Sequence, residues 1–189
     1  MKFYLTDRKE HFKKHLDYLK NQPVRVYDRD KLSEKISTVE IAVTKTLDRL
    51  DLTFLFNYAI FPENIMTYLT QWQEENREMQ IGDTILQQAY IPPFRNFSQK
   101  IIFGVRINEI IDEPHRKGFS YETLMGHVEN GISTFTIEQL HNTIVFKIRT
   151  YSVPGNFLTK LLGPFFSVPY QAYCTRKALE NVKRQIEKR

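Results

Sequence analysis

Apolar and polar side chains alternate at a period of two residues through the middle of the chain, which is typical of β-strands with one buried face. The alternation predicts strands over residues 65–73, 84–91, 100–112, 118–125, 132–140 and 143–152. In the last two, the apolar phase contains Phe135, Ile137, Ile144, Phe146 and Ile148. Turn-forming residues at Gln80–Asp83, Asn130–Gly131 and His141–Asn142 fit hairpins, so we expect an antiparallel sheet covered on one side.

Helical periodicity flanks this alternation at both ends of the chain. Residues 7–20 carry Phe12, Leu16 and Leu19 on one helical face, and residues 171–187 carry a similar apolar stripe. Each pattern predicts an amphipathic helix. Between the first helix and the six strands, the remaining predicted elements are a strand over residues 35–46 and a buried helix or helix pair over residues 47–61.

The order of these elements indicates an α+β fold in a single domain over residues 1–189, with an N-terminal helical extension at about residues 1–34. A strongly curved antiparallel sheet with one dry face needs a cover, and the C-terminal helix is the element that can lie across it. We therefore predict a curved sheet of six or seven strands that grips a long C-terminal helix. This is the helix-grip plan of the START-like and birch-allergen superfamily.

The segment Gly118–Gly131 carries a motif with specific spacing. It reads Gly-Phe-Ser-Tyr-Glu-Thr-Leu-Met-Gly-His-Val-Glu-Asn-Gly and is followed by Phe135. It resembles the Gly-Phe-x-Tyr-Gly-Thr-Leu-x-Gly-His signature of a family of uncharacterised bacterial and plant proteins, known only as a domain of unknown function. Further matching elements, within a resemblance over residues 100–175, are Ile111–Glu113, Tyr151–Pro154, Gly163–Pro164 and Gln171.

The chain departs from this signature in three places. Glu122 stands where the family has a glycine, and Ile132–Ser133 stands where the family has a pair of glutamates. The tryptophan that usually follows the first helix is absent. The resemblance therefore implies a domain of the helix-grip kind and no particular activity, and roles that would need those glutamates are not carried over to this chain.

The net charge of +5 is concentrated at the two ends of the chain. Residues 1–35 and residues 176–189 each hold a net charge of +4, and the residues between them hold −3. Both ends are predicted to be solvated helices. The middle lacks the cluster of arginines and aromatics that grips phosphates and stacks bases. We therefore expect no nucleic-acid partner.

Cysteine content and hydropathy bear on the compartment. Cys174 is the single cysteine, so no intrachain disulfide can form, which suits a reducing environment. The first residues lack the apolar stretch of a signal peptide, and the most apolar segment is shorter than the ~20 residues that cross a bilayer. We expect a cytoplasmic protein without a transmembrane segment, and the oligomeric state stays open.

Few side chains point to chemistry. His11 and His15 lie one helical turn apart, a spacing that can bind a metal ion, but a third ligand is missing, and we expect no metal and no cofactor. We single out Tyr121, Thr123 and His127 as ligand-binding residues. Tyr121 and Thr123 share a strand face, and His127 follows where the chain must turn back over that face. The alternative is that all three only stabilise the hairpin, and we assign no catalytic residue.

Three functions fit these observations. We favour a small-molecule binding module with an apolar cavity for a lipid-like or aromatic ligand. The first alternative is an enzyme of the same fold that uses His127, Tyr121 and Thr123 on a ligand carbonyl or hydroxyl. The second is a protein- or membrane-surface interaction module, in which Phe165 and Phe166 would be exposed together with Tyr170.

Overall fold

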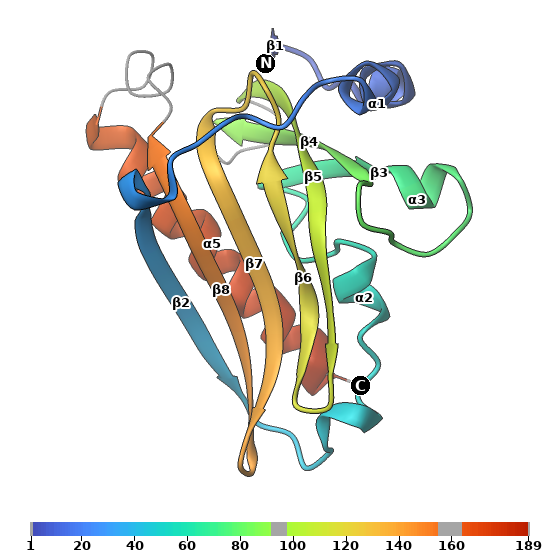
Figure 1. Ribbon diagram of the computed structural model, residues 1–189, viewed down its shortest axis with the longest axis vertical. Helices are drawn as coiled ribbons and strands as arrows, with labels where there is room; N and C mark the ends of the chain where they lie inside the picture. The colour runs from blue at the N-terminus through green and yellow to red at the C-terminus, as the bar shows by residue number, and fades with distance from the viewer. Residues whose placement is uncertain (1, 92–97, 155–163, 189) are drawn as a thin grey trace.

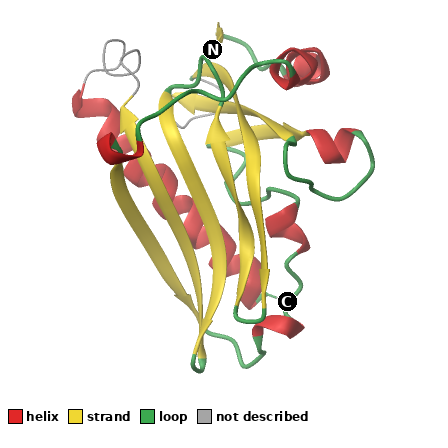
Figure 2. Cartoon of the chain, in the orientation of Figure 1, coloured by secondary structure: helices red, strands yellow, loops and turns green. Residues whose placement is uncertain are grey.

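The computed structural model describes residues 2–91, 98–154 and 164–188 (Figure 2). The strands are β1 (Lys2–Tyr4), β2 (Ser33–Ile41), β3 (Met66–Thr70), β4 (Thr84–Ile91), β5 (Gln99–Glu113), β6 (Arg116–Thr123), β7 (Glu129–Leu140) and β8 (Thr143–Pro154). The α-helices are α1 (Phe12–Lys20), α2 (Thr53–Phe56), α3 (Gln71–Glu74) and α5 (Pro164–Glu187). Short 3₁₀ turns are η1 (Lys9–His11), η2 (Arg29–Lys31) and η3 (Leu47–Arg49).

The strands form one antiparallel sheet (Figure 1). Neighbouring strands follow the order β2–β8–β7–β6–β5–β4–β3, and β1 pairs with the start of β5 outside this order. The predicted fold class is confirmed, because a curved antiparallel sheet lies against a long C-terminal helix. The pairing of β1 adds a strand that the sequence pattern did not indicate, since β1 has only 3 residues.

The inner face of the sheet holds the main core, and α5 crosses this face behind β8 and β7 in Figure 1. Phe135 lies directly opposite Ile148, and Ile137 lies opposite Phe146, so the predicted apolar phases meet on the same face. Phe146 is fully buried. The residues of α5 that join this cluster are Ala178, Val182 and Ile186. The inward positions expected from the alternation are therefore confirmed.

The helix α1 covers the opposite face of β4 and β5. Leu16 and Leu19 belong to one buried cluster with Leu86 and Leu124. Gly104 makes room for this contact, because a Cβ atom there would lie 2.9 Å from the Leu19 side chain. The expectation of a sheet covered on one side only is wrong for these strands. The apolar face of an amphipathic helix needs a partner surface, and β4 and β5 provide it.

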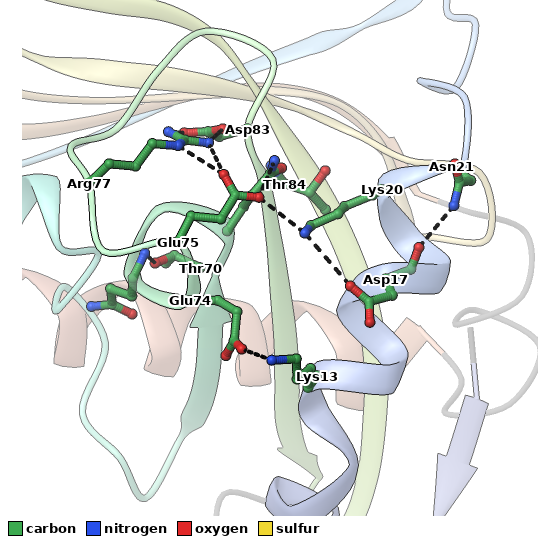
Figure 3. A network of polar contacts seen from close by, with 12 residues as sticks. Lys13, Asp17, Lys20, Asn21, Thr70, Glu74, Glu75, Arg77, Asp83 and Thr84 are labelled. Atoms are coloured by element: carbon green, nitrogen blue, oxygen red, sulfur yellow. Dashed lines mark hydrogen bonds and ion pairs between the residues drawn. The ribbon is translucent and has the colours of Figure 1, made fainter.

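Ion pairs join α1, α3 and the start of β4 (Figure 3). The Arg77 guanidinium donates to both carboxylate oxygens of Asp83, at 2.7 and 2.5 Å. Asp83 is buried, so this paired geometry satisfies a carboxylate that has lost most of its water. Two further pairs hold α1 to the end of α3, namely Lys13–Glu74 and Lys20–Glu75.

Two local predictions are wrong. Residues 47–61 form only η3 and α2 instead of a helix or helix pair, and Tyr58 has a φ of 62°, a left-handed value that ends a helix. Asn130–Gly131 is not a hairpin turn, because it lies inside β7. The chain turns at residues 124–128 instead, where Gly126 has a φ of 83°.

Candidate functional site

A cavity of about 190 Å³ lies between the inner face of the sheet and the first half of α5. Apolar side chains form most of its wall, among them Ala89, Ile91, Phe103, Phe135 and Ile148 from the strands and Ile65 from the turn before β3. Polar side chains enter the wall from β2, β4, β6, β7, β8 and α5. The arrangement is an apolar space with a limited set of polar groups directed into it.

Two glycines of the sequence motif are required by close packing beside this cavity. A Cβ atom on Gly118 would lie 2.0 Å from the backbone oxygen of Phe135. A Cβ atom on Gly131 would lie 1.9 Å from the backbone oxygen of Tyr151. No side chain can occupy either position without moving the neighbouring backbone. The motif glycines therefore set how closely β6, β7 and β8 approach one another.

Of the three residues that the sequence singled out, Tyr121 and His127 line the cavity and Thr123 does not. Thr123 is buried, and its hydroxyl oxygen accepts a hydrogen bond from the Gly131 N–H at 3.1 Å. This bond ties the two strands together just before and after the turn. The structure thus brings two of the three residues to one cavity, and a ligand-binding role for them stays a prediction.

His127 is fixed by its own loop. Its Nδ1 accepts a hydrogen bond from the Glu129 N–H at 2.9 Å, and its ring meets Phe103 edge to face with centroids 4.5 Å apart. Burial is the main cause that lowers the pKa of His127 to about 3, so the imidazole is neutral at pH 7. Nδ1 also lies 3.1 Å from the Glu129 backbone oxygen, so the Glu129 backbone engages this nitrogen in either neutral tautomer. Nδ1 is therefore occupied and not available as a base.

Glu129 and Lys35 bring opposite charges to the same cavity. The Glu129 carboxylate accepts a hydrogen bond from the Gln171 side-chain amide, which links the start of β7 to α5. Burial raises the pKa of Glu129, and the Lys35 ammonium acts in the opposite direction. Lys35 is exposed on β2, so this pair of charges marks the open rim of the cavity.

Three hydroxyl side chains cross the inner face of the sheet in one row. Tyr121 of β6 lies opposite Ser133 of β7, which lies opposite Thr150 of β8. Lys35 of β2 continues the line as the partner of Thr150. The hydroxyls of Ser133 and Thr150 are hydrogen bonded at 3.1 Å, and the Tyr121 ring meets the Tyr58 ring edge to face with centroids 6.3 Å apart. All three hydroxyl residues line the cavity, and we call Tyr121, Ser133 and Thr150 the hydroxyl row.

The helix α5 contributes Tyr170 and Cys174 to the wall. Tyr170 is half-buried, and its hydroxyl donates to the backbone oxygen of Tyr90 at 2.7 Å. Burial raises the pKa of the Cys174 thiol to about 11, so the thiol stays protonated at neutral pH and is a poor nucleophile. The side chains of Phe165 and Phe166 lie outside the described part of the chain.

Sequence reasoning missed Lys35, Gln87, Ser133 and Thr150, which all line the cavity. A signal was present for two of them. Ser133 and Thr150 are polar residues in the apolar phase of their strands, which is unusual for a dry sheet face. The pairing that aligns them with each other depends on strand register, which the alternation alone does not provide.

No metal site is found among the described residues, where no three His, Cys, Asp or Glu side chains are grouped to hold an ion. His11 contacts Glu10, and His15 is hydrogen bonded to the Tyr4 hydroxyl at 3.2 Å.

Within residues 2–91, 98–154 and 164–188, every helix is too short or too polar to cross a membrane.

A curved antiparallel sheet that encloses a cavity with a long C-terminal helix defines a helix-grip protein. Within this class, residues 23–181 match the family described as Domain of unknown function (DUF1990). The chain belongs to this family. The resemblance seen in the motif at Gly118–Gly131 is therefore confirmed, and the predicted helix-grip fold is confirmed by the structure.

Solved structures share the fold at low sequence identity. The di-domain ARO/CYC StfQ from the steffimycin biosynthetic pathway has a TM-score of 0.53 at 11% identity, over 85% of this chain and 52% of that chain. A hypothetical protein from Helicobacter pylori has a TM-score of 0.52 at 10% identity, over 83% and 88%. A protein from Mycobacterium smegmatis has a TM-score of 0.51 at 14% identity, over 86% and 97%. These likenesses concern the fold alone. No curated protein matches the chain.

Proposed function

We propose that this protein binds a small, largely apolar molecule, lipid-like or aromatic, in the cavity between the sheet and α5. The observation that carries the proposal is the cavity itself, whose wall is mostly apolar with a few polar groups directed inward. This is the usual composition of a small-molecule site. Protein interiors are otherwise close-packed, and an unfilled apolar space loses packing contacts, which favours an occupant.

The size of the cavity favours a compact ligand. A cavity of about 150 Å³ is large enough to hold benzene, whereas pockets for drug-sized molecules begin at about 300 Å³. The cavity here has a volume of about 190 Å³. It therefore suits a molecule of one ring, or a short segment of an aliphatic chain.

The first alternative, an enzyme that acts through His127, Tyr121 and Thr123, has less support. The Thr123 hydroxyl is engaged by the Gly131 N–H, and Nδ1 of His127 is engaged by the Glu129 N–H. A general base must reach the proton that it removes, and neither of these atoms is directed at the cavity contents. Binding without chemistry is therefore the function that the geometry supports better.

The second alternative, an interaction module, requires exposed aromatics at Phe165, Phe166 and Tyr170. Tyr170 is half-buried, and its hydroxyl is bonded to the backbone of β4. This residue is thus engaged in holding α5 to the sheet beside the cavity, which favours the binding function. We also propose a cytoplasmic location, in keeping with the single cysteine of the chain, Cys174, which cannot form an intrachain disulfide.

The test is native mass spectrometry of the protein purified from its source organism. We expect a fraction of the wild-type protein to carry a small molecule. Ala89→Leu fills the cavity and is expected to lose this mass, while Ala172→Leu, at an exposed position on α5, keeps it. Thermal unfolding confirms that both variants fold. A wild-type protein without any bound molecule, whose melting temperature no small apolar compound raises, would rule out the proposal.

A further inference from the structure

We propose that the ligand of the cavity is a small monocarboxylate, whose carboxylate lies beside Lys35 and the hydroxyls of Ser133 and Thr150. Its single ring or short aliphatic chain fills the apolar part of the cavity. This assignment rests on the proposed binding function and adds the polar group of the ligand and its orientation. Two features carry it: the polar lining residues gather at one side of the sheet, and the lysine on that side forms no ion pair within the described part of the chain.

The wall of the cavity changes character from one side of the sheet to the other. The strands β2, β8 and β7 form one side, and β5, β4 and β3 form the other (Figure 1). On the first side most lining residues are polar, and these are Lys35, Glu129, Ser133, Thr150 and Ser152. On the second side all lining residues except Gln87 are apolar, and these are Met66, Ala89, Ile91 and Phe103. A ligand with one polar end and one apolar end therefore matches this wall in a single orientation.

Lys35 is the cation that this wall offers to a ligand. It lies on the inner face of β2 with Val39 and Ile41, because these residues are spaced evenly along the strand and the latter two pack in the main core. The preceding residue, Glu34, is paired with Arg149 at 2.5 Å. Lys35 itself forms no ion pair with any residue in 2–91, 98–154 and 164–188. A lysine of this kind lays its aliphatic stem along an apolar wall and keeps its ammonium at the wet rim.

The hydroxyls of Ser133 and Thr150 lie next to Lys35 in the sheet. Thr150 is the register partner of both Ser133 and Lys35, so the three residues stand on neighbouring strands, about 4.8 Å apart. Two hydroxyl groups joined by one hydrogen bond keep a second hydrogen that this bond does not use. A carboxylate has two oxygens that only accept. One oxygen can accept from this hydroxyl hydrogen while the other accepts from the Lys35 ammonium.

Glu129 is the negative charge that such a ligand must avoid. It precedes Ser133 by four positions on β7, which places its backbone about 13 Å further along the strand. The Glu129 carboxylate accepts a hydrogen bond from the Gln171 side-chain amide, which holds it toward α5. Lys35 is in register with the hydroxyl pair, and Glu129 is not. The anionic end of the ligand is therefore expected on the Lys35 side of the rim.

The volume of the cavity leaves the carboxylate of the ligand at the opening. A cavity of about 150 Å³ already holds benzene, and the cavity here measures about 190 Å³, so a ring leaves little further room inside. Lys35 is exposed to water, and a carboxylate beside it keeps part of its hydration. Burial of the ring then provides most of the affinity, and the charge provides the selection among ring compounds.

Hydrocinnamate and hydrocinnamamide provide the test, because they share a ring and a short chain and differ only in a carboxylate or a neutral amide. Both are titrated into the purified protein at pH 7 and low salt, and the dissociation constants are measured by NMR. We expect wild type to bind the acid about fivefold more tightly, a preference that decreases at high salt because ions screen an exposed pair. Lys35→Gln removes the charge and is expected to bring the ratio close to one. Lys14→Gln is the matched control, since it makes the same change at an exposed position of α1 that does not line the cavity.

The wild-type ratio tests the proposal by itself, and thermal unfolding shows whether both variants are folded. Equal binding of acid and amide overturns the carboxylate assignment and leaves the proposed binding function standing. A preference for the acid that persists in Lys35→Gln also overturns it, because another group must then bind the carboxylate. Tighter binding of 3-phenylpropylamine, which carries a positive charge on the same ring and chain, overturns it in favour of recognition by Glu129. Failure of all three compounds to bind overturns the assignment, and if no molecule co-purifies with the protein, it overturns the binding function as well.

Discussion

At the scale of single residues, the inner face of the sheet carries apolar side chains that form the core and polar side chains that line the cavity. Phe135 and Ile148 are opposite each other and buried, as the alternation predicts. Ser133 and Thr150, two residues away on the same strands and the same face, are polar and line the cavity. Hydroxyls on a largely dry face cost free energy unless they are hydrogen bonded. Their mutual bond at 3.1 Å meets this cost and leaves them next to the cavity.

Phe146 offers the clearest test of the inner face. It is fully buried, with Val39 and Ile137 as its partners on the two neighbouring strands. Phe146→Ala removes a ring from a packed core, and we expect a loss of ~3–5 kcal/mol in the free energy of unfolding. Denaturant titration measures it. Leu140→Ala, at an exposed end of β7, is the control and is expected to change little. Similar small losses for both variants would contradict the assignment of the inner face.

At the scale of elements, α1 shows how an apparently peripheral helix becomes part of the body. Its apolar face covers β4 and β5, while its polar side is joined to the end of α3 by the pairs Lys13–Glu74 and Lys20–Glu75. Solvated ion pairs contribute little. The apolar contact of Leu16 and Leu19 is therefore the main attachment of α1, and the lysines mainly set its direction.

The pair between Arg77 and Asp83 is expected to contribute more than the lysine pairs. Asp83 is 4% exposed and accepts two hydrogen bonds from Arg77 and one from the Gln80 N–H. Asp83→Asn weakens these charge-assisted bonds, and we expect a loss of about 2 kcal/mol in the free energy of unfolding. Lys13→Ala, which removes an exposed partner, is expected to lose less than Asp83→Asn, because solvent screens the Lys13–Glu74 pair. Urea titration of both variants compares them, and equal losses would show that burial of Asp83 does not matter.

At the scale of the whole molecule, the cavity region couples stability to pH in two opposite directions. Burial raises the pKa of Glu129 in the folded protein, so its contribution to stability is present at low pH and is lost as pH rises through the raised pKa. Burial lowers the pKa of His127 to about 3, so its contribution is present above its unfolded pKa of about 6.5 and is lost as pH falls toward 3. Neutral forms of both groups therefore suit the cavity.

Glu129→Gln separates the two contributions. The glutamine keeps the shape and cannot be charged, so the variant avoids the cost of a buried carboxylate at high pH. We expect its free energy of unfolding, relative to wild type, to rise with pH above about 4.5, by at most about 1.4 kcal/mol per pH unit. Thermal and urea unfolding between pH 4 and pH 8 measure the difference. Parallel profiles of the two proteins would contradict a raised pKa for Glu129.

Part of the site follows from residues that are close in sequence. The motif at Gly118–Gly131 led to Tyr121 and His127, and both line the cavity. Thr123 followed from the same face of the same strand, but its hydroxyl is used inside the hairpin. Periodicity predicts which face of the sheet a side chain lies on. It does not predict whether the hydroxyl of that side chain already accepts a hydrogen bond from a neighbouring backbone N–H.

The sequence by itself determined the antiparallel sheet, its inner apolar positions and the C-terminal helix. Alternation and helical periodicity are local patterns, and they can be recognised before it is known which strands pair. Only the tertiary structure decided that Lys35, Thr150, Ser133 and Tyr121 form one line, since this requires the register of three strand pairs. It also decided that α1 covers β4 and β5 and that Gln171 reaches Glu129. These contacts join residues far apart in the chain, so the free energy that selects them comes from the packed whole and from no single segment.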